Sequence, residues 1–257
     1  MKVTWYGTAS IGIEDGETKL LFDPFVRQKK KLKTTDIEDY AGADAILVTH
    51  GHFDHILDIP RIADYDKNVQ IYCTKTPAET LQREKVPADR ISVIKPGESF
   101  EIGKFKITPY QAKHIVFDAG YIISVIPKCV AMFPILFKQF FGWNMKMPEN
   151  HEIVMYLIEN DGKSVLLCGS FGTVDWVRYP ENPDMFILAN GGNVSIPELT
   201  RPFIESIRPK TVFVDHFDNA FPPLTRRIKV EKFADKMSEW HPEIKFIVPK
   251  ELQTYEV

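Results

Sequence analysis

Three features that would assign a chain to a particular class of protein are scarce or missing in this sequence. Its 257 residues include only three cysteines, Cys73, Cys129 and Cys168, and no two of them have C-x-x-C spacing. This argues against a disulfide framework or a thiolate zinc site, so we expect free thiols in a reducing cytoplasm. The net charge of −3 is too small to indicate a nucleic-acid-binding surface. We therefore expect no nucleic-acid partner.

Long uninterrupted apolar stretches are also missing. The opening MKVTWYGTAS lacks the apolar core of a secretion signal. The most apolar segment, residues 121–147, is interrupted by Pro127, Lys128, Pro134 and Lys138, whereas a membrane-spanning helix needs about 20 predominantly apolar residues. We expect a buried helical insertion and no transmembrane segment. The insertion could also cover a substrate, contact a membrane surface or join subunits of a homo-oligomer.

Short apolar segments, typical of strands, occur in both halves of the chain. Those near the N-terminus are separated by Gly7 and Asp15-Gly16, and the sequence around Asp161-Gly162 predicts a two-residue hairpin. Strands are expected at residues 2–7, 10–15, 19–24, 46–48, 90–94, 99–103, 104–110, 152–160, 163–169, 184–190 and 211–216.

Helices are expected between these strands. One should cover residues 76–86, opened by Thr76 with Pro77 in its first turn, and others should lie near residues 198–207 and 226–240. A hydrophobic content of 44% and a charged content of 26% are ordinary for a globular protein. Together these patterns predict one α/β domain over residues 1–257, built as an αββα sandwich of two packed sheets with helices outside.

The segment VTHGHFDH, residues 48–55, concentrates three of the seven histidines in the chain. His50 and His52 follow an expected strand two positions apart, and extended backbone at that spacing points both imidazoles the same way. Asp54 and His55 come at the turn into the next element, where they can face a second point nearby. Imidazole nitrogens and carboxylate oxygens bind zinc at about 2.0–2.2 Å. The cluster therefore favours a metal site over a structural loop.

Further ligands should also come from strand ends. His114 follows the expected strand 104–110, and His216 follows the late strand that begins at residue 211. His151 lies in the polar stretch PENHE and is expected to be exposed. His241 lies in EWHPE and is expected at the surface or at a helix end.

The hexapeptide HGHFDH resembles the HxHxDH signature of the metallo-β-lactamase superfamily. The resemblance extends to Asp23-Pro24 after the N-terminal strands, to His114, to the central hairpin and to His216. The stretches HFDN and DMFILANGGN look like the branch that includes the ascorbate-6-phosphate lactonases. The resemblance covers most of the chain outside residues 121–147.

This resemblance implies a centre for one or two divalent cations. His50, His52 and His114 would hold the first metal, and Asp54, His55 and His216 the second. A hydroxide between the ions would be the nucleophile, and Asp54 would orient it or move its proton. Zinc is the expected ion, with manganese and iron as alternatives.

The sequence departs from the family pattern after the hairpin. The family usually has a bridging aspartate there, after a glycine, whereas this chain has Ser170, a neutral and poor zinc ligand. Asp175 or Asp215 could compensate. A second departure is Thr8, where the related branch often has a histidine.

The expected function is metal-dependent hydrolysis of an ester, lactone or phosphodiester in a small-molecule substrate. The apolar segment that follows His114 favours a substrate with an apolar portion. The alternative is a catalytically impaired metal-binding or assembly module of the same fold. A nuclease is disfavoured because the chain has no added domain and no basic surface.

Overall fold

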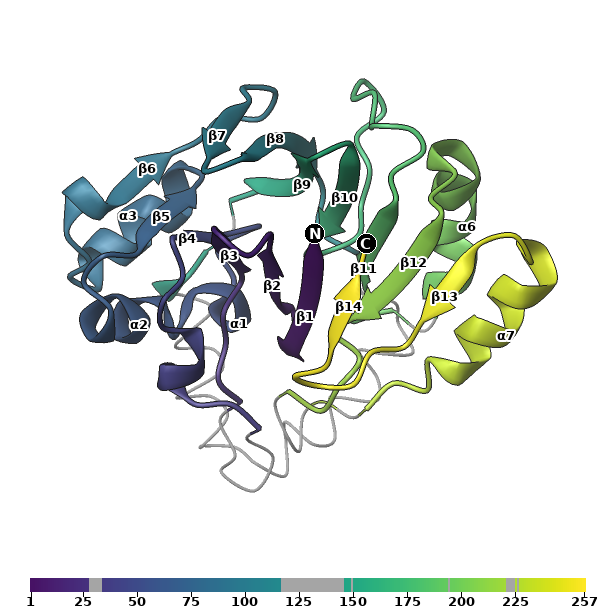
Figure 1. The fold of residues 1–257 in the computed structure, drawn as a ribbon, viewed down its shortest axis with the longest axis horizontal. Helices are drawn as coiled ribbons and strands as arrows, with labels where there is room; N and C mark the ends of the chain where they lie inside the picture. Colours follow the sequence, from purple (N-terminus) through teal and green to yellow (C-terminus); the bar gives the residue numbers. More distant parts are fainter. Residues whose placement is uncertain (28–33, 117–145, 149, 194, 221–224, 226) are drawn as a thin grey trace.

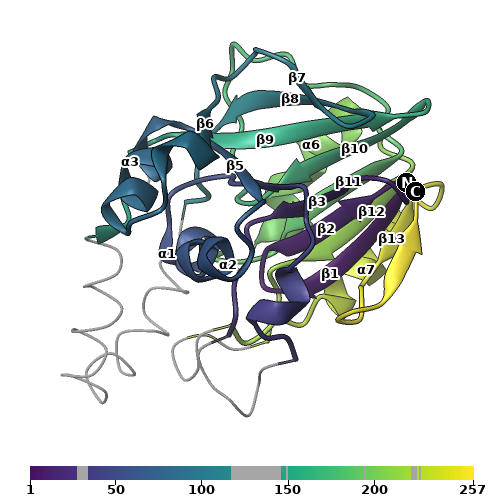
Figure 2. The ribbon, with the colours of Figure 1, turned by 60° about the vertical axis from the view of Figure 1, so that its left-hand side comes forward.

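Two β-sheets face each other at the centre of the molecule, and helices cover the outer side of each sheet (Figures 1 and 2). This computed structural model describes residues 1–27, 34–116, 146–148, 150–193, 195–220, 225 and 227–257. Within these residues each sheet has seven strands. The predicted αββα sandwich is confirmed. Most of the predicted insertion at 121–147 lies outside the described residues.

The first sheet joins an N-terminal antiparallel meander to a parallel half. Strands β3 to β6 run parallel, and β14 pairs with β1, so the two chain ends lie side by side (Figure 1). In spatial order the strands are β14 (Thr254–Glu256), β1 (Lys2–Gly7), β2 (Ser10–Glu14), β3 (Lys19–Phe22), β4 (Ala45–Leu47), β5 (Gln70–Cys73) and β6 (Ile91–Val93). The helical elements on this side are η2 (Ile37–Tyr40), α1 (Phe53–Ile56), α2 (Ile59–Tyr65), α3 (Lys75–Arg83) and η3 (Ala88–Arg90).

The second sheet has an antiparallel half and a parallel half in the same way. Its strands are β13 (Lys245–Ile247), β12 (Thr211–Asp215), β11 (Met185–Ala189), β10 (Lys163–Cys168), β9 (Ile153–Asn160), β8 (Phe105–Ala112) and β7 (Phe100–Ile102). Strands β10 to β13 run parallel, with α6 (Ile196–Ile207) between β11 and β12 and α7 (Glu231–Trp240) between β12 and β13. Asp161 and Gly162 form the predicted hairpin turn with φ of +49° and +71°.

The parallel strands β11 and β12 are buried on both faces, which explains their continuous apolar sequences. On the outer face, the Phe186 ring lies 5.5 Å from the ring of Phe203 in α6. On the inner face, the Phe213 ring lies 5.4 Å from that of Tyr255 in β14. The main core therefore fills the space between the sheets and continues under α6 and α7. A second core packs α2 and α3 onto the first sheet.

The two sheets are joined next to the end of β4. The Tyr156 hydroxyl of β9 donates a hydrogen bond to the carbonyl of Val48 at 2.7 Å, and the Val154 N–H donates to the carbonyl of Thr49 at 3.0 Å. These bonds fix the start of the histidine-rich segment to the opposite sheet.

The helix predicted over residues 76–86 differs in its bounds. It runs from Lys75 to Arg83, and its N-cap is Thr74 rather than Thr76. The Thr76 N–H and hydroxyl both donate to the carboxylate of Glu152, at 2.8 and 2.9 Å. A carboxylate from a distant segment therefore satisfies the first turn, which local sequence cannot show.

The remaining helices lie close to their predicted positions. The helix predicted at 198–207 begins two residues earlier, with Pro197 in its first turn, where proline is favoured. The helix predicted at 226–240 begins at Glu231.

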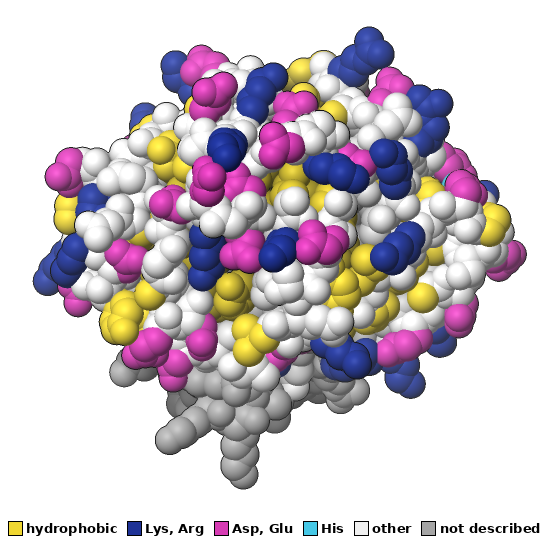
Figure 3. Space-filling view, viewed as in Figure 1, with side chains coloured by type: hydrophobic (Ala, Val, Ile, Leu, Met, Phe, Trp, Pro, Cys, Tyr) yellow, Lys and Arg dark blue, Asp and Glu magenta, His cyan; other side chains and the backbone are white. Residues whose placement is uncertain are grey.

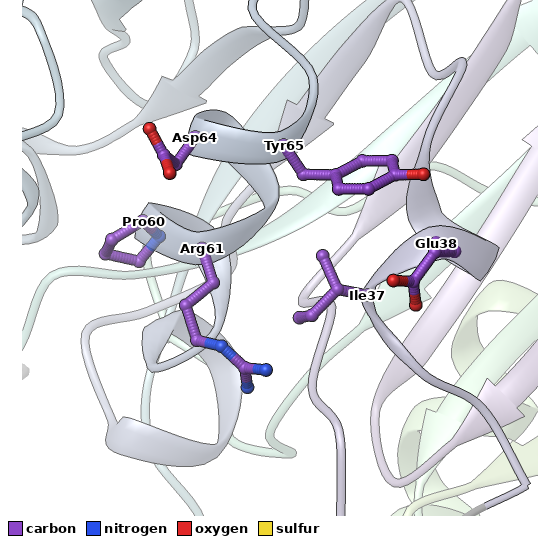
Figure 4. A pocket seen from close by; sticks show the side chains of 6 residues that line it. All are labelled: Ile37, Glu38, Pro60, Arg61, Asp64 and Tyr65. Carbon is purple, nitrogen blue, oxygen red and sulfur yellow. The ribbon is translucent and has the colours of Figure 1, made fainter.

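The face shown in Figure 3 carries basic and acidic side chains interspersed, without a large patch of one sign. Among the described helices, none has the length and apolar character to cross a membrane. A pocket of about 440 Å³ lies between η2 and α2 (Figure 4). None of the predicted metal ligands lines it; its lining residues are Ile37, Glu38, Pro60, Arg61, Asp64 and Tyr65.

Candidate metal centre

The first group of candidate ligands consists of three histidines. The ligand atoms of His50, His52 and His114 all lie within 4.8 Å of one another. His50 lies three residues after β4, His52 is the N-cap of α1, and His114 lies two residues after β8. The first sheet thus supplies two imidazoles and the second sheet supplies the third.

The second group combines a carboxylate with two histidines. Asp54 and His55 lie in the short helix α1, and His216 directly follows β12 of the second sheet. Their ligand atoms also lie within 4.8 Å of one another, and His216 Nε2 is 3.2 Å from Asp54 Oδ2. The rings of His50 and His55 are 3.9 Å apart between centroids, so the two groups adjoin.

All six predicted ligands are therefore brought together at one end of the sandwich. The other histidines lie elsewhere. His151 is exposed, as predicted. His241 is the C-cap of α7, at the predicted helix end, and its side chain is only 12% exposed.

Asp23 and Thr49 orient one histidine of each group. Asp23 is fully buried, and its Oδ2 accepts hydrogen bonds from His55 Nδ1 at 2.7 Å and from the Thr49 hydroxyl at 2.5 Å. Its Oδ1 accepts from the Thr49 N–H at 2.8 Å. The Thr49 oxygen lies 3.0 Å from His50 Nδ1. Both imidazoles thus use Nδ1 for these contacts and keep the Nε2 lone pair for a cation, an arrangement typical of metal-bound histidine.

In the sequence, Asp23 stands out only through the family resemblance, and no pattern marks Thr49 itself. Gly169 permits the close packing of this pair. A Cβ atom at position 169 would collide with the Thr49 hydroxyl and lie 2.8 Å from Asp23 Oδ2. Gly169, which ends the expected strand at 163–169, is therefore the residue that could have indicated this close contact from the sequence.

Burial and charge act differently on the two groups. Burial, reinforced by the neighbouring histidines, lowers the pKa of His50 well below its usual range, and burial lowers the pKa of His52 to about 4. In the second group burial alone would raise the pKa of Asp54 and lower that of His216. Electrostatic interaction with His55 and the contact with His216 instead lower the pKa of Asp54, and the Asp54 carboxylate raises the pKa of His216 to about 9.

These protonation states affect metal binding differently in the two groups. In the first group, the lowered pKa values of His50 and His52 keep both imidazoles neutral, with lone pairs available to a cation. The second offers an ionised carboxylate. A cation there would have to displace the proton that His216 shares with Asp54.

Ser170, and the two acids Asp175 and Asp215 that could compensate for the missing bridging aspartate, lie in different environments. Ser170 is buried, and its hydroxyl oxygen accepts a hydrogen bond from the N–H of Ile115 at 3.1 Å, next to His114. Asp175 is exposed. Asp215 is buried, burial raises its pKa well above the usual range, and neither ligand group includes it.

Comparison with known proteins identifies the family. The profile of the beta-lactamase superfamily domain matches residues 18–191, which include five of the six candidate ligands. The chain belongs to this superfamily. This chain is 26% identical to a UPF0173 metal-dependent hydrolase of Ruegeria pomeroyi over 269 residues, and the match covers 100% of both chains.

Solved structures share the fold. Igni18, a metallo hydrolase of Ignicoccus hospitalis, superposes with a TM-score of 0.68 at 20% identity, covering 100% of this chain and 98% of Igni18. CmlA, a diiron β-hydroxylase of Streptomyces venezuelae, superposes with a TM-score of 0.61 at 13% identity, covering 100% of this chain and 54% of CmlA. This chain thus shares the metallo-β-lactamase fold, and the relative from Ruegeria pomeroyi is named a metal-dependent hydrolase.

Proposed function

We propose that the two ligand groups hold one or two divalent cations, and that the protein hydrolyses an ester, lactone or phosphodiester bond there. One observation carries this proposal: six side chains from two sheets form two adjoining groups, each with its ligand atoms within 4.8 Å. Bound cations would supply an activated water and polarise the scissile group.

Asp54 is the proposed catalytic residue. Its Oδ2 lies 3.2 Å from His216 Nε2 and its Oδ1 lies 3.9 Å from His55 Nε2, so it adjoins both other members of its group. Its lowered pKa keeps the carboxylate ionised. Such a group can orient a water molecule and accept its proton at a carboxylate oxygen.

Two exposed apolar side chains near His114 support a substrate with an apolar portion. Val116, two residues after His114, is 80% exposed, and Trp176 is 76% exposed. Lys113 Nζ lies over the Trp176 ring at 5.9 Å from its centroid, which places this tryptophan beside the same chain segment. Exposed aromatic surface beside a chain segment that carries a candidate ligand is suited to holding an apolar group.

Zinc is the proposed ion, because three imidazoles are a common zinc ligand set. Iron and manganese remain alternatives, since histidine and carboxylate suit them too. CmlA, with the same fold, is described as a diiron enzyme. The two described cysteines, Cys73 and Cys168, are both free, which agrees with the proposed cytoplasmic location.

A metal-binding or assembly module without turnover is the second candidate. The observation that favours it is the neutral hydroxyl of Ser170, which is hydrogen-bonded to Ile115. The two groups together then contain a single carboxylate.

Metal analysis combined with a hydrolysis screen tests the proposal. We expect one or two equivalents of metal in the purified protein and turnover of at least one ester, lactone or phosphodiester. His52→Ala should abolish turnover, whereas His151→Ala, an exposed histidine outside both groups, should not change it. Bound metal without turnover of any substrate would support the assembly module. No metal after incubation with Zn²⁺, Mn²⁺ or Fe²⁺ would refute both candidates.

A further inference from the structure

The turn between β1 and β2 holds the backbone of His216, although the two are far apart in sequence. The His216 N–H donates a hydrogen bond to the carbonyl of Thr8 at 2.8 Å, and Trp5 Nε1 donates to the same oxygen at 2.9 Å. In the opposite direction, the Thr8 N–H donates to Asp218 Oδ1 at 3.1 Å. Thr8 and the segment 216–218 are thus linked reciprocally.

Both residues at this contact have an unfavourable backbone conformation. Thr8 has φ of +52° and His216 has φ of +53°, in the left-handed region that side chains with a Cβ rarely adopt. Such conformations persist only where surrounding contacts hold them. If the contacts were lost, relaxation of the His216 backbone would move its imidazole away from Asp54, which now lies 3.2 Å away.

Asp218 also contacts residues from other parts of the chain. Its Oδ2 lies 3.5 Å from Arg27 Nη1, and Arg27 also pairs with Glu251 and donates to the Thr34 hydroxyl at 2.7 Å. The neighbouring Phe217 ring stacks on Trp5 at 4.8 Å between centroids. The side chain of Asp218 is only 8% exposed.

We propose that Asp218 is a positioning residue for the second ligand group. By holding the Thr8 N–H, it fixes the turn whose carbonyl keeps His216 in its left-handed conformation, and so it raises the affinity of Asp54, His55 and His216 for a cation. The inference rests on the proposed function only in that this group binds a cation. The first group is anchored through other residues, and its affinity should not depend on Asp218.

Zinc titrations of metal-free protein in two backgrounds test this. His52→Ala weakens the first group and reports on the second, and His55→Ala does the reverse. In the His52→Ala background, Asp218→Ala should lower zinc affinity by about 10–100-fold, as loss of a residue that orients a metal ligand does. In the His55→Ala background it should change affinity less than about twofold. Asp218→Asn retains an acceptor for the Thr8 N–H and should restore most of the loss.

Asp184 provides a matched control for a general loss of stability. Its side chain is 10% exposed, its Oδ2 accepts from the Ser164 N–H at 2.9 Å, and its Oδ1 pairs with Lys210 at 2.8 Å, at the opposite end of β11. Asp184→Ala should leave zinc affinity unchanged. If Asp218→Ala does not fold, Asp218→Ser, whose hydroxyl is too short for the Thr8 contact, replaces it.

The inference would be overturned if the His52→Ala background binds zinc and adding Asp218→Ala leaves that affinity unchanged. The proposed function would not be affected by this result. An equal loss in both backgrounds would also overturn the inference. Failure of the unmutated protein to bind zinc would instead remove the proposed function, and this inference with it.

Discussion

The two ligand groups adjoin each other but differ in charge. His50, His52 and His114 are all imidazoles, and burial lowers the pKa of both His50 and His52. The second group contains the carboxylate of Asp54, which stays ionised beside His216. A cation gains direct charge attraction only in the second group, and this attraction is strong where water is excluded. We therefore expect the second group to bind its ion more tightly.

The groups also differ in how the second sheet completes them. His114 follows the antiparallel strand β8, and the Ser170 hydroxyl oxygen accepts from the next N–H after it, that of Ile115. His216 follows the parallel strand β12 with a strained backbone that Thr8 holds. The pair of Asp23 and Thr49, on the side of the first sheet, contacts one histidine of each group. The following substitutions separate these contributions.

The largest effect is expected from Asp54→Asn, which removes the carboxylate while keeping the side-chain shape. Loss of a proton-accepting group should lower kcat/KM by about 10²–10⁴-fold. Zinc binding by the second group should weaken, while the first group keeps its affinity. Initial rates of the single Asp54→Asn variant measure the first effect, and zinc titrations in the His52→Ala and His55→Ala backgrounds measure the second. Asp64→Asn, an exposed acid in α2, is the control; equal activity of the two variants would exclude a catalytic role for Asp54.

Asp23→Ala should affect both groups through the fold. It leaves the Thr49 N–H, the Thr49 hydroxyl and His55 Nδ1 without their buried acceptor. Each unsatisfied donor costs about 1–3 kcal/mol, and relaxation recovers part, so the free energy of unfolding should fall by about 2–5 kcal/mol. Urea denaturation of the metal-free protein measures this.

Zinc affinity should fall in both groups of Asp23→Ala by about 10–100-fold, because His50 and His55 both lose their orientation. Asp23→Asn keeps one acceptor oxygen and should lose less in both measurements. A loss confined to one group would contradict the shared role of Asp23 and Thr49.

The six candidate ligands were predictable because each follows a strand or opens a helix, and because HGHFDH resembles a known signature. The contacts that orient them were not. The Thr8–Asp218 bond joins residues 210 positions apart, and one partner is a backbone N–H, which no residue pattern marks. The N-cap error at Thr76 has the same origin, since Glu152 lies 76 positions away. Patterns predict local structure and ligand chemistry, whereas orientation depends on which segments the fold places together.

The smallest effect is expected from Ser170→Asp, which would make the two groups more alike. One carboxylate oxygen could keep the hydrogen bond from the Ile115 N–H, while the added charge lies close to His114 in the chain fold. We expect zinc affinity of the first group, measured in the His55→Ala background, to rise about tenfold, equivalent to about 1.4 kcal/mol. Ser170→Asn has the same shape without the charge and should give no gain.

These two variants separate charge from geometry at position 170. A gain with aspartate alone would show that the first group is weak because it lacks a negative charge. Equal gains with asparagine would mean that side-chain length, rather than charge, limits the group. A lower affinity with aspartate would show that the serine serves to anchor Ile115, since a carboxylate buried without a cation would cost stability and disturb His114. In that case the fold around Ile115 would require a neutral side chain at position 170, and a single substitution there could not give the first group a negative charge without lowering its zinc affinity.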